Sequence, residues 1–366
     1  MDKLFDTSWT IHRLSPLYHG REFQTLLDNP AALEAYALRL RDLLRGDVLR
    51  GVQVGLGDLG APDDALSKAG FLTECTWEAL PTWSFWNTEH SLLEDPEQRP
   101  KTFELVNTLG ILVTLEFENA TYKAALLAGP QGYHDLRTEL THLPLLLTRL
   151  PSSLRQTFIT FLSSNFDTRC SNLRLPSSFL GGELERYIAG VVGSENQRVE
   201  SAASRSVIER IIKETQLTLS FAPNIAPSLK TLDVNIPRES LPTFYFHGSK
   251  MEERKGGSDT ETPSRFMTAL SNYFDTNLAM KLDLTDGPRP RDAGPKMVRL
   301  SRVSCGAFIL GGEGRIKFIA NAGHVAPEDP DDSDEEDEDL VERRRIGEAN
   351  EALLQSLIQR AMGSDH

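Results

Sequence analysis

The chain has 366 residues, 39% hydrophobic and 25% charged, as expected of a globular protein with one large domain or two ordinary ones. Three widely separated cysteines argue against a disulfide framework and a zinc module, and they favour a reducing compartment. The first residues lack the apolar core of a secretory signal, and the longest apolar runs are too short to span a bilayer.

The net charge of −14 is concentrated in one segment. Residues 328–339 hold ten acidic residues and no basic one, so the rest of the chain carries only −4. Two stretches, 141–180 and 287–319, are locally basic. Direct binding to DNA is therefore an open alternative. Its candidate contact residues are Arg149, Arg155, Arg169, Arg174, Arg299, Arg315 and Lys317.

The first part of the chain mixes helix and strand signals. Asn29 and Pro30 predict the start of a helix, and Gly46 predicts its end. Residues 111–128 predict a β-hairpin, because alternate apolar side chains of the first strand would share one face. Residues 133–192 are predicted to be mostly helical, with breaks at prolines.

The second part is richer in strand signals, with a further helix expected from Thr262 onward. Because strands and helices do not alternate regularly, the sequence predicts an α+β fold with a largely antiparallel sheet flanked by helices. The expected strands are 216–221, 229–236, 297–304, 306–310 and 315–320. The expected organisation is an α+β body over 1–327, with a helix-rich middle at 133–215 and a strand-rich part at 216–320, followed by an acidic disordered linker at 328–339 and a helix at 340–362.

Gly55, Gly57 and Gly60 form a glycine-rich loop that resembles a dinucleotide-binding turn. In such a site a helix begins within the motif, whereas here Pro62 and Asp63 restart the helix later. The sequence therefore favours an ordinary loop and predicts no cofactor. An enzyme of unrecognised class that binds a nucleotide here is kept as an alternative.

The remaining candidate chemistry is sparse. The histidines have no metal-ligand spacing, and no recognisable catalytic motif is present, so no catalytic or metal residues are predicted. Four aromatic residues, Trp77, Trp83, Phe85 and Trp86, could form a binding cage, but packing in the core is favoured. The acidic run could be a solvated tether or a lure for basic partners, and Ser333 within it is in a context typical of phosphorylation by acidophilic kinases.

Three stretches resemble the CENP-L family of inner-kinetochore subunits. The first is LFDTSWTIHRLSPLYHG, in which the resemblance is carried by Trp9, Thr10, His12, Arg13, Leu14, Ser15, Pro16, Leu17 and Tyr18. The others are 217–239 and 297–320. The resemblance implies a non-enzymatic α+β protein with a curved, mostly antiparallel sheet, located at the centromere in the nucleus and supporting chromosome segregation.

The resemblance also implies a heterodimer with a CENP-N-type subunit, formed through strands near the end of the chain. Contact with the centromeric nucleosome would be indirect, and the chain could form a homodimer when its partner is absent. A strand-rich end could offer an edge for such pairing. The residues expected at the partner surface are Val298, Leu300, Arg302, Phe308, Leu310, Ile316 and Phe318.

Overall fold

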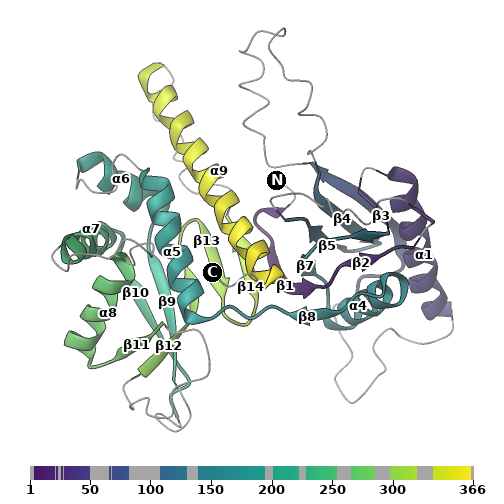
Figure 1. Ribbon diagram of the computed structural model, residues 1–366, viewed down its shortest axis with the longest axis horizontal. Coiled ribbons are helices and arrows are strands. Elements are labelled where there is room, and N and C mark those ends of the chain that lie inside the picture. The colour runs from purple at the N-terminus through teal and green to yellow at the C-terminus, as the bar shows by residue number, and fades with distance from the viewer. Residues whose placement is uncertain are drawn as a thin grey trace. The chain divides into compact units, whose positions relative to one another are not determined.

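The computed structural model describes residues 4–20, 22–23, 26–27, 29–49, 66, 68–81, 108–129, 139–193, 201–221, 228–253, 265–284, 297–319 and 333–363. Where the sequence predicts one body, the chain divides into two compact units. Unit 1 contains Trp9–Leu173 and Gln355–His366, and unit 2 contains Asp2–Ser8 and Arg174–Leu354. Each unit combines strands with helices (Figure 1).

Unit 1 is built on an antiparallel sheet in which β1, β7, β5, β4 and β3 are successive neighbours, and β8 also pairs with β1. The predicted hairpin is confirmed as the β4–β5 pair, whose strands meet at a turn around Asn119. The elements of the unit are β1 (Ser8–Leu14), β2 (Leu17–Tyr18), α1 (Pro30–Leu49), β3 (Leu72–Pro81), β4 (Thr108–Phe117), β5 (Thr121–Leu127), β6 (Leu140–Thr141), β7 (Leu145–Arg149), α4 (Ser152–Phe166) and β8 (Cys170–Asn172).

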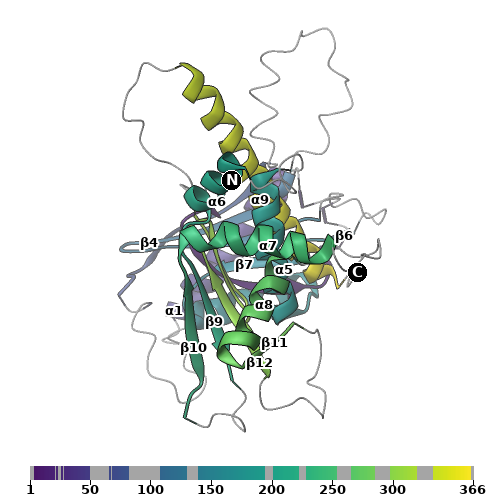
Figure 2. The same ribbon diagram turned by 90° about the vertical axis from the view of Figure 1, so that its left-hand side faces the viewer.

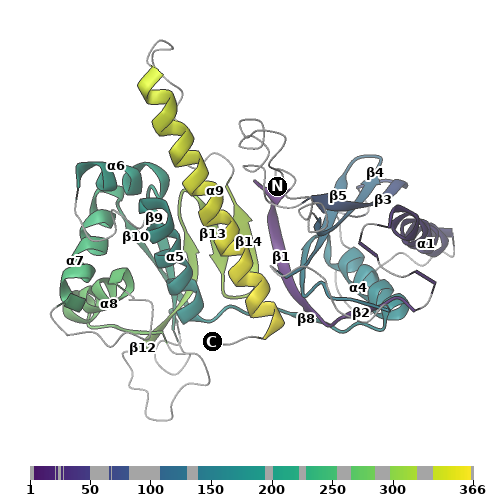
Figure 3. The same ribbon diagram turned by 45° about the horizontal axis from the view of Figure 1, so that its top comes forward.

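Helices α1 and α4 cover the same face of this sheet (Figure 3). The Trp77 indole on β3 packs against Tyr36 of α1, with ring centroids 6.1 Å apart, and against Phe158 and Phe166 of α4 at 6.5 and 6.3 Å. Aromatic rings at such distances contribute both buried area and favourable edge contacts. Core packing of Trp77 is thus confirmed, whereas Trp83, Phe85 and Trp86 lie outside the described residues.

Two local predictions in unit 1 are wrong. Leu145–Arg149 is a strand rather than a helix, and Leu145, Leu146 and Leu147 are all buried. A short run that is apolar at every position has no period, so it does not distinguish a buried strand from a buried helix. Helix α1 continues past Gly46 to Leu49, because a glycine inside a helix weakens it without terminating it.

Unit 2 contains a second series of strands in the order β10, β9, β12, β13 and β14, with β11 alongside β12. The described pairings are antiparallel, with β11 and β12 as a parallel exception, so the predicted α+β class is confirmed. The elements of the unit are α5 (Ser177–Val192), α6 (Ala202–Ile211), β9 (Thr215–Ser220), β10 (Thr231–Ile236), a 3-10 turn (Arg238–Ser240), α7 (Leu241–Glu253), α8 (Arg265–Leu278), β11 (Lys281–Asp283), β12 (Met297–Ser304), β13 (Phe308–Gly311) and β14 (Arg315–Phe318).

Helix α5 is the central helix of unit 2. Its Ser177 hydroxyl donates to the carbonyl of Leu300 on β12, and its Tyr187 ring packs on Phe308 of β13. The Glu185 carboxyl group, which is buried, accepts the backbone N–H groups of Phe266 and Met267 at 3.2 and 3.5 Å. These N–H groups belong to the first turn of α8, where no intrahelical acceptor exists, so Glu185 supplies the missing acceptors.

The last helix, α9 (Ser333–Met362), contributes residues to both units. In unit 2 its Asn350 accepts a hydrogen bond from the Tyr187 hydroxyl at 3.1 Å, and Ala349 packs against Gly190. In unit 1 the Arg13 guanidinium donates to the carbonyl of Met362. The sequence predicts a disordered linker over 328–339, whereas the structure places residues 333–339 at the start of this helix. Acidic residues in a first helical turn interact favourably with the positive end of the helix dipole.

His12 lies in the interior of unit 1, between β7 and α4. The Thr148 hydroxyl donates to the carbonyl of Thr10, so the 3.2 Å contact between His12 Nε2 and Thr148 Oγ1 requires the imidazole to donate. Nδ1 is then unprotonated and shielded from solvent. Burial, together with the charge of Arg155, lowers the pKa of His12 to about 4, although the neighbouring Asn172 side chain on β8 slightly offsets this shift by raising the pKa.

Glu185→Ala should destabilise unit 2 by about 1–2 kcal/mol, because the first turn of α8 would lose both acceptors. Glu185→Gln keeps one acceptor oxygen and should cost less. Urea denaturation followed by circular dichroism measures the difference. Glu313→Ala, at an exposed turn, is the control and should leave the midpoint unchanged; equal effects of Glu185→Ala and Glu313→Ala would contradict the capping role.

His12 should make the protein less stable as the pH falls. Between its ordinary pKa of 6.5 and about 4, the unfolded chain binds a proton at His12 that the folded chain does not. The stability is therefore complete above pH 6.5 and declines toward pH 4. Melting temperatures measured across this range should show a shallower decline for His12→Gln than for the wild type. The exposed His247 provides the control substitution, and an unchanged slope in His12→Gln would refute the assignment.

Candidate interaction surfaces

The residues predicted for the partner surface lie on β12, β13 and β14 of unit 2. Six of the seven are buried within the chain, and only the Arg302 side chain is exposed. The buried six are Val298, Leu300, Phe308, Leu310, Ile316 and Phe318. These six apolar side chains therefore pack in the core of the chain and are not exposed for contact with a partner.

Strand β10 ends the series of strands in unit 2 (Figure 2). β12 is paired on both sides, with β9 and β13, whereas β10 is paired only with β9 among the described residues. Alternate backbone N–H and C=O groups of a strand paired on one side point away from the sheet and can pair with another chain. Among the described residues β10 is therefore an open edge of unit 2, outside the predicted residues. The three-residue strand β11, which pairs only with β12, is a second and shorter one.

Apolar side chains accompany this open edge. Leu232 and Val234 of β10 are only half-buried, although they lie opposite Leu219 and Leu217, which are fully buried on β9. Leu229, just before the strand, is 46% exposed. Apolar surface that continues past a buried core to an unpaired edge is suited to further burial by a partner.

The basic residues proposed for DNA contact are divided between the two units. Arg149, Arg155 and Arg169 belong to unit 1, and the other four belong to unit 2. Arg299 pairs with the buried Asp283 at 3.1 Å, and Arg315 pairs with Glu313 at 3.2 Å, so these two charges are locally balanced. Both pairs reduce the positive potential around the arginines, and the exposed Arg315–Glu313 pair contributes little stability.

Unit 1 contains a basic pair that the sequence did not indicate. Register places Lys123 of β5 directly opposite Arg149 of β7, although the two are far apart in the chain. Continuing across the sheet, Lys123 lies opposite Thr114 of β4, and Thr114 lies opposite Thr76 of β3. These four side chains form one row on the face away from α1 and α4, with its positive charge at the β5–β7 end.

The cysteine thiols are poorly suited to nucleophilic chemistry. Burial raises the pKa of Cys75 to about 12 and those of Cys170 and Cys305 to about 11, so all three are protonated near neutral pH.

Within the described ranges no group of three or more histidine, cysteine or acidic residues is placed to hold a metal ion. The glycine-rich loop with Gly55, Gly57 and Gly60 lies outside those ranges, so the structure does not describe it.

Helix α9 begins at Ser333, the residue proposed for phosphorylation. A phosphate at a helix N-terminus is favoured by the helix dipole, but the following acidic residues would oppose it. Phosphorylation of Ser333 stays a prediction.

None of the described helices has the length and apolarity that crossing a bilayer requires.

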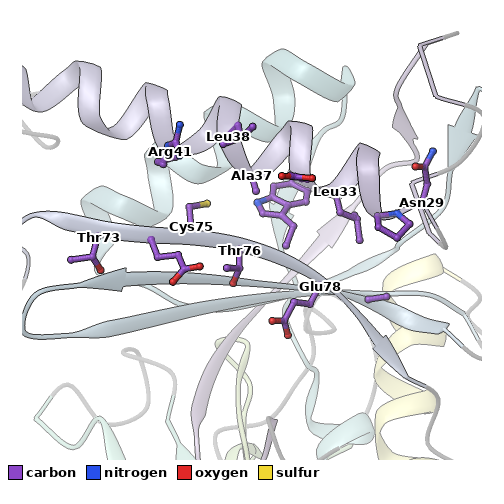
Figure 4. Close-up of a pocket in the computed structure, with 14 residues that line it drawn as sticks. Asn29, Leu33, Ala37, Leu38, Arg41, Thr73, Cys75, Thr76 and Glu78 are labelled. Atoms are coloured by element: carbon purple, nitrogen blue, oxygen red, sulfur yellow. The ribbon is translucent and has the colours of Figure 1, made fainter.

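A groove of about 510 Å³ lies between α1 and β3 in unit 1 (Figure 4). Leu33 and Ala37 of α1 form part of one wall, and Cys75 and Trp77 of β3 form part of the other. The sequence did not predict this groove, because α1 and β3 are separated by more than twenty residues and only the folded chain brings them together.

Comparison with known families identifies the chain. The family model for centromere protein L, CENP-L, matches residues 3–362. No curated protein matches the sequence. The family match extends through both units and beyond the three stretches in which the resemblance was noticed. The chain therefore belongs to the CENP-L family of nuclear, inner-kinetochore proteins.

Proposed function

We propose that the chain is a non-catalytic scaffold subunit that pairs with a CENP-N-type protein at centromeric chromatin and supports chromosome segregation. Membership of a structural kinetochore family supports this role. The observation that carries the pairing itself is the open edge of β10 with its half-buried Leu232 and Val234.

Strand addition is the proposed mode of pairing. A strand of the partner would accept and donate hydrogen bonds along the outer edge of β10, and its apolar side chains would cover Leu232 and Val234. The polar face of β10, which includes the exposed Asp233 and Asn235, would remain near solvent. Asp233 is held by the Thr218 hydroxyl at 2.6 Å, which keeps this carboxylate in position on its own face.

The seven residues first expected at the partner surface have a supporting role in this proposal. Leu300 lies opposite Leu219 of β9, which in turn lies opposite Leu232 of β10. The buried side chains of β12 therefore support β9, and through it β10, without touching the partner in this proposal. Arg302, which is exposed, is the one member of the set able to contact another protein. Phe318→Asp would test folding rather than pairing, because Phe318 is buried.

The double substitution Leu232→Lys and Val234→Lys should abolish pairing while the chain stays folded. Both positions already have partial access to water, so lysine can extend into solvent, but a bound partner would have to desolvate two ammonium groups. We expect the affinity for a co-expressed CENP-N-type subunit to fall about tenfold or more. Size-exclusion chromatography and calorimetric titration measure this change.

The matched control is Leu43→Lys with Leu278→Lys, two exposed leucines on α1 and α8, and it should co-elute with the partner as the wild type does. Retention of the complex by the folded β10 variant would place the dimer surface elsewhere. The isolated chain at high concentration provides a second comparison: if it forms a homodimer through the same edge, only the β10 variant becomes monomeric.

Direct DNA contact is a second candidate, supported by the adjacent Lys123 and Arg149 on β5 and β7. Two like charges side by side on a sheet repel each other, and a phosphate between them would remove the repulsion. If the chain reaches the nucleosome only through partner proteins, it needs no phosphate-binding site of its own.

Lys123→Glu with Arg149→Glu should lower the affinity for a short DNA duplex and reduce the slope of log affinity against log salt by about 2. Arg39→Glu with Arg238→Glu, two exposed arginines already paired with glutamates, is the control for net charge. If both double variants have the same slope as the wild type, DNA is not bound at this pair.

A further inference from the structure

We propose that the groove between α1 and β3 binds an extended peptide segment of another protein, one that carries lysine or arginine at alternate positions and adds to β3 as a strand. The site is in unit 1 and is independent of the pairing proposed for β10.

Strand β3 has an open edge along the groove. Among the described residues it pairs only with β4. The start of the strand is already occupied, since Arg45 of α1 donates to the carbonyls of Leu72 and Thr73. Thr73 is also the bulged residue of the β3–β4 pair. The backbone from Glu74 to Ala79 therefore forms the part of the edge to which another strand can be added.

The side chains of β3 alternate between two environments (Figure 4). Cys75 and Trp77 lie on the face toward α1, where Leu33 and Ala37 form an apolar wall. A strand added beside β3 would direct every second side chain under this wall. A volume of about 510 Å³ is enough for such side chains, and small or branched apolar residues suit it best.

The other face of β3 is acidic. Thr76 and Glu78 point away from α1 (Figure 4). Strand alternation places Glu74 on the same face, and both glutamates are exposed. Register places Glu116 of β4 directly opposite Glu74, so two carboxylates already face each other across the pair. Like charges in directly opposed positions destabilise a sheet, whereas a basic side chain opposite Glu74 on an added strand would be attracted to both. This pattern selects lysine or arginine on the outer face of the peptide.

The base of the groove is largely apolar. Trp77 is 7% exposed, and its indole N–H interacts with the neighbouring Cys75 sulfur, a weak acceptor. Valine and threonine side chains directed under α1 would pack on this aromatic surface. Arg41 of α1 also lines the groove, but its charge is balanced by Asp42 at 3.0 Å.

The probe is a fluorescein-labelled, N-acetylated and C-amidated heptapeptide, Lys-Val-Lys-Thr-Lys-Val-Lys, titrated with the full-length chain by fluorescence anisotropy. We expect saturable binding that weakens with added salt, because exposed ion pairs contribute to it. The peptide Glu-Val-Glu-Thr-Glu-Val-Glu should not bind. Glu74→Lys with Glu78→Lys should weaken binding of the lysine peptide about tenfold or more, since attraction becomes repulsion.

Glu313→Lys with Glu348→Lys is the matched control, because it changes the net charge equally at exposed positions of unit 2 and should leave binding unchanged. Two N-methylated lysine peptides test strand addition itself. In an antiparallel strand the N–H groups of alternate residues point to the same neighbour, so methylating one alternate set should abolish binding and methylating the other should not.

The proposal would be overturned if both methylated peptides bound the wild-type chain equally well. It would also be overturned if the variant with Glu74→Lys and Glu78→Lys bound the lysine peptide as tightly as the wild type does. Circular dichroism of each variant confirms that a loss of binding reflects the surface and not unfolding. Because β10 is not touched by these substitutions, co-elution with a CENP-N-type subunit should be unaffected by them.

Discussion

An open antiparallel sheet must end in strands whose outer backbone groups have no partner in the sheet. Peptide N–H and C=O groups are obligatory hydrogen-bonding groups, and an edge either faces water, is covered, or pairs with another chain. Among the described residues the longer strands with one unpaired side are β10 in unit 2 and β3 in unit 1. The three-residue strands β11 and β8 also have a single neighbour each. Both interaction surfaces argued above follow from where the two series of strands stop.

The interior of each unit explains why the edges, and not the middle strands, are available. In unit 1 Trp77 holds α1 and α4 on one face of the sheet through Tyr36, Phe158 and Phe166. In unit 2 α5 contacts β12 and β13 while Glu185 fixes the first turn of α8. In unit 2 these helix contacts lie on the middle strands β12 and β13. In unit 1 Trp77 belongs to the outermost strand, so the helices cover one face of β3 and leave its other face and its outer backbone edge for a partner.

Local patterns were enough to predict much of the fold. Alternation from Ile111 to Phe117 predicted the β4–β5 hairpin, and the strand signals at 216–221 and 229–236 predicted β9 and β10. Leu145–Leu147 was mistaken for helix because burial on both faces removes the alternation that identifies a strand. The start of α9 was missed because high charge indicates solvation, which an exposed helix also satisfies.

Interaction surfaces were harder to predict, because alternating apolar residues indicate that one face of a strand is buried. They do not indicate whether the chain itself or a partner protein buries that face. Leu300 and Leu232 have the same side chain in similar strands, yet Leu300 is buried by the chain and Leu232 remains half-exposed. The difference arises from β9, which lies between β10 and β12 although it is distant from β12 in the sequence. Only the pairing of strands that are far apart in the sequence shows which strand lies at the edge of the sheet.

The two edges differ in the partners that their charges allow. If β3 paired with β3 of a second copy, Glu74 and Glu78 would meet carboxylates of the same kind, and the repulsion would add to that already present between Glu74 and Glu116. Self-pairing at β3 is thus disfavoured, and a basic segment is selected. On β10 the one carboxylate, Asp233, is held by Thr218, and Leu232 and Val234 add apolar surface. That edge lacks a comparable electrostatic barrier, so shape and apolar complementarity decide which strand it accepts.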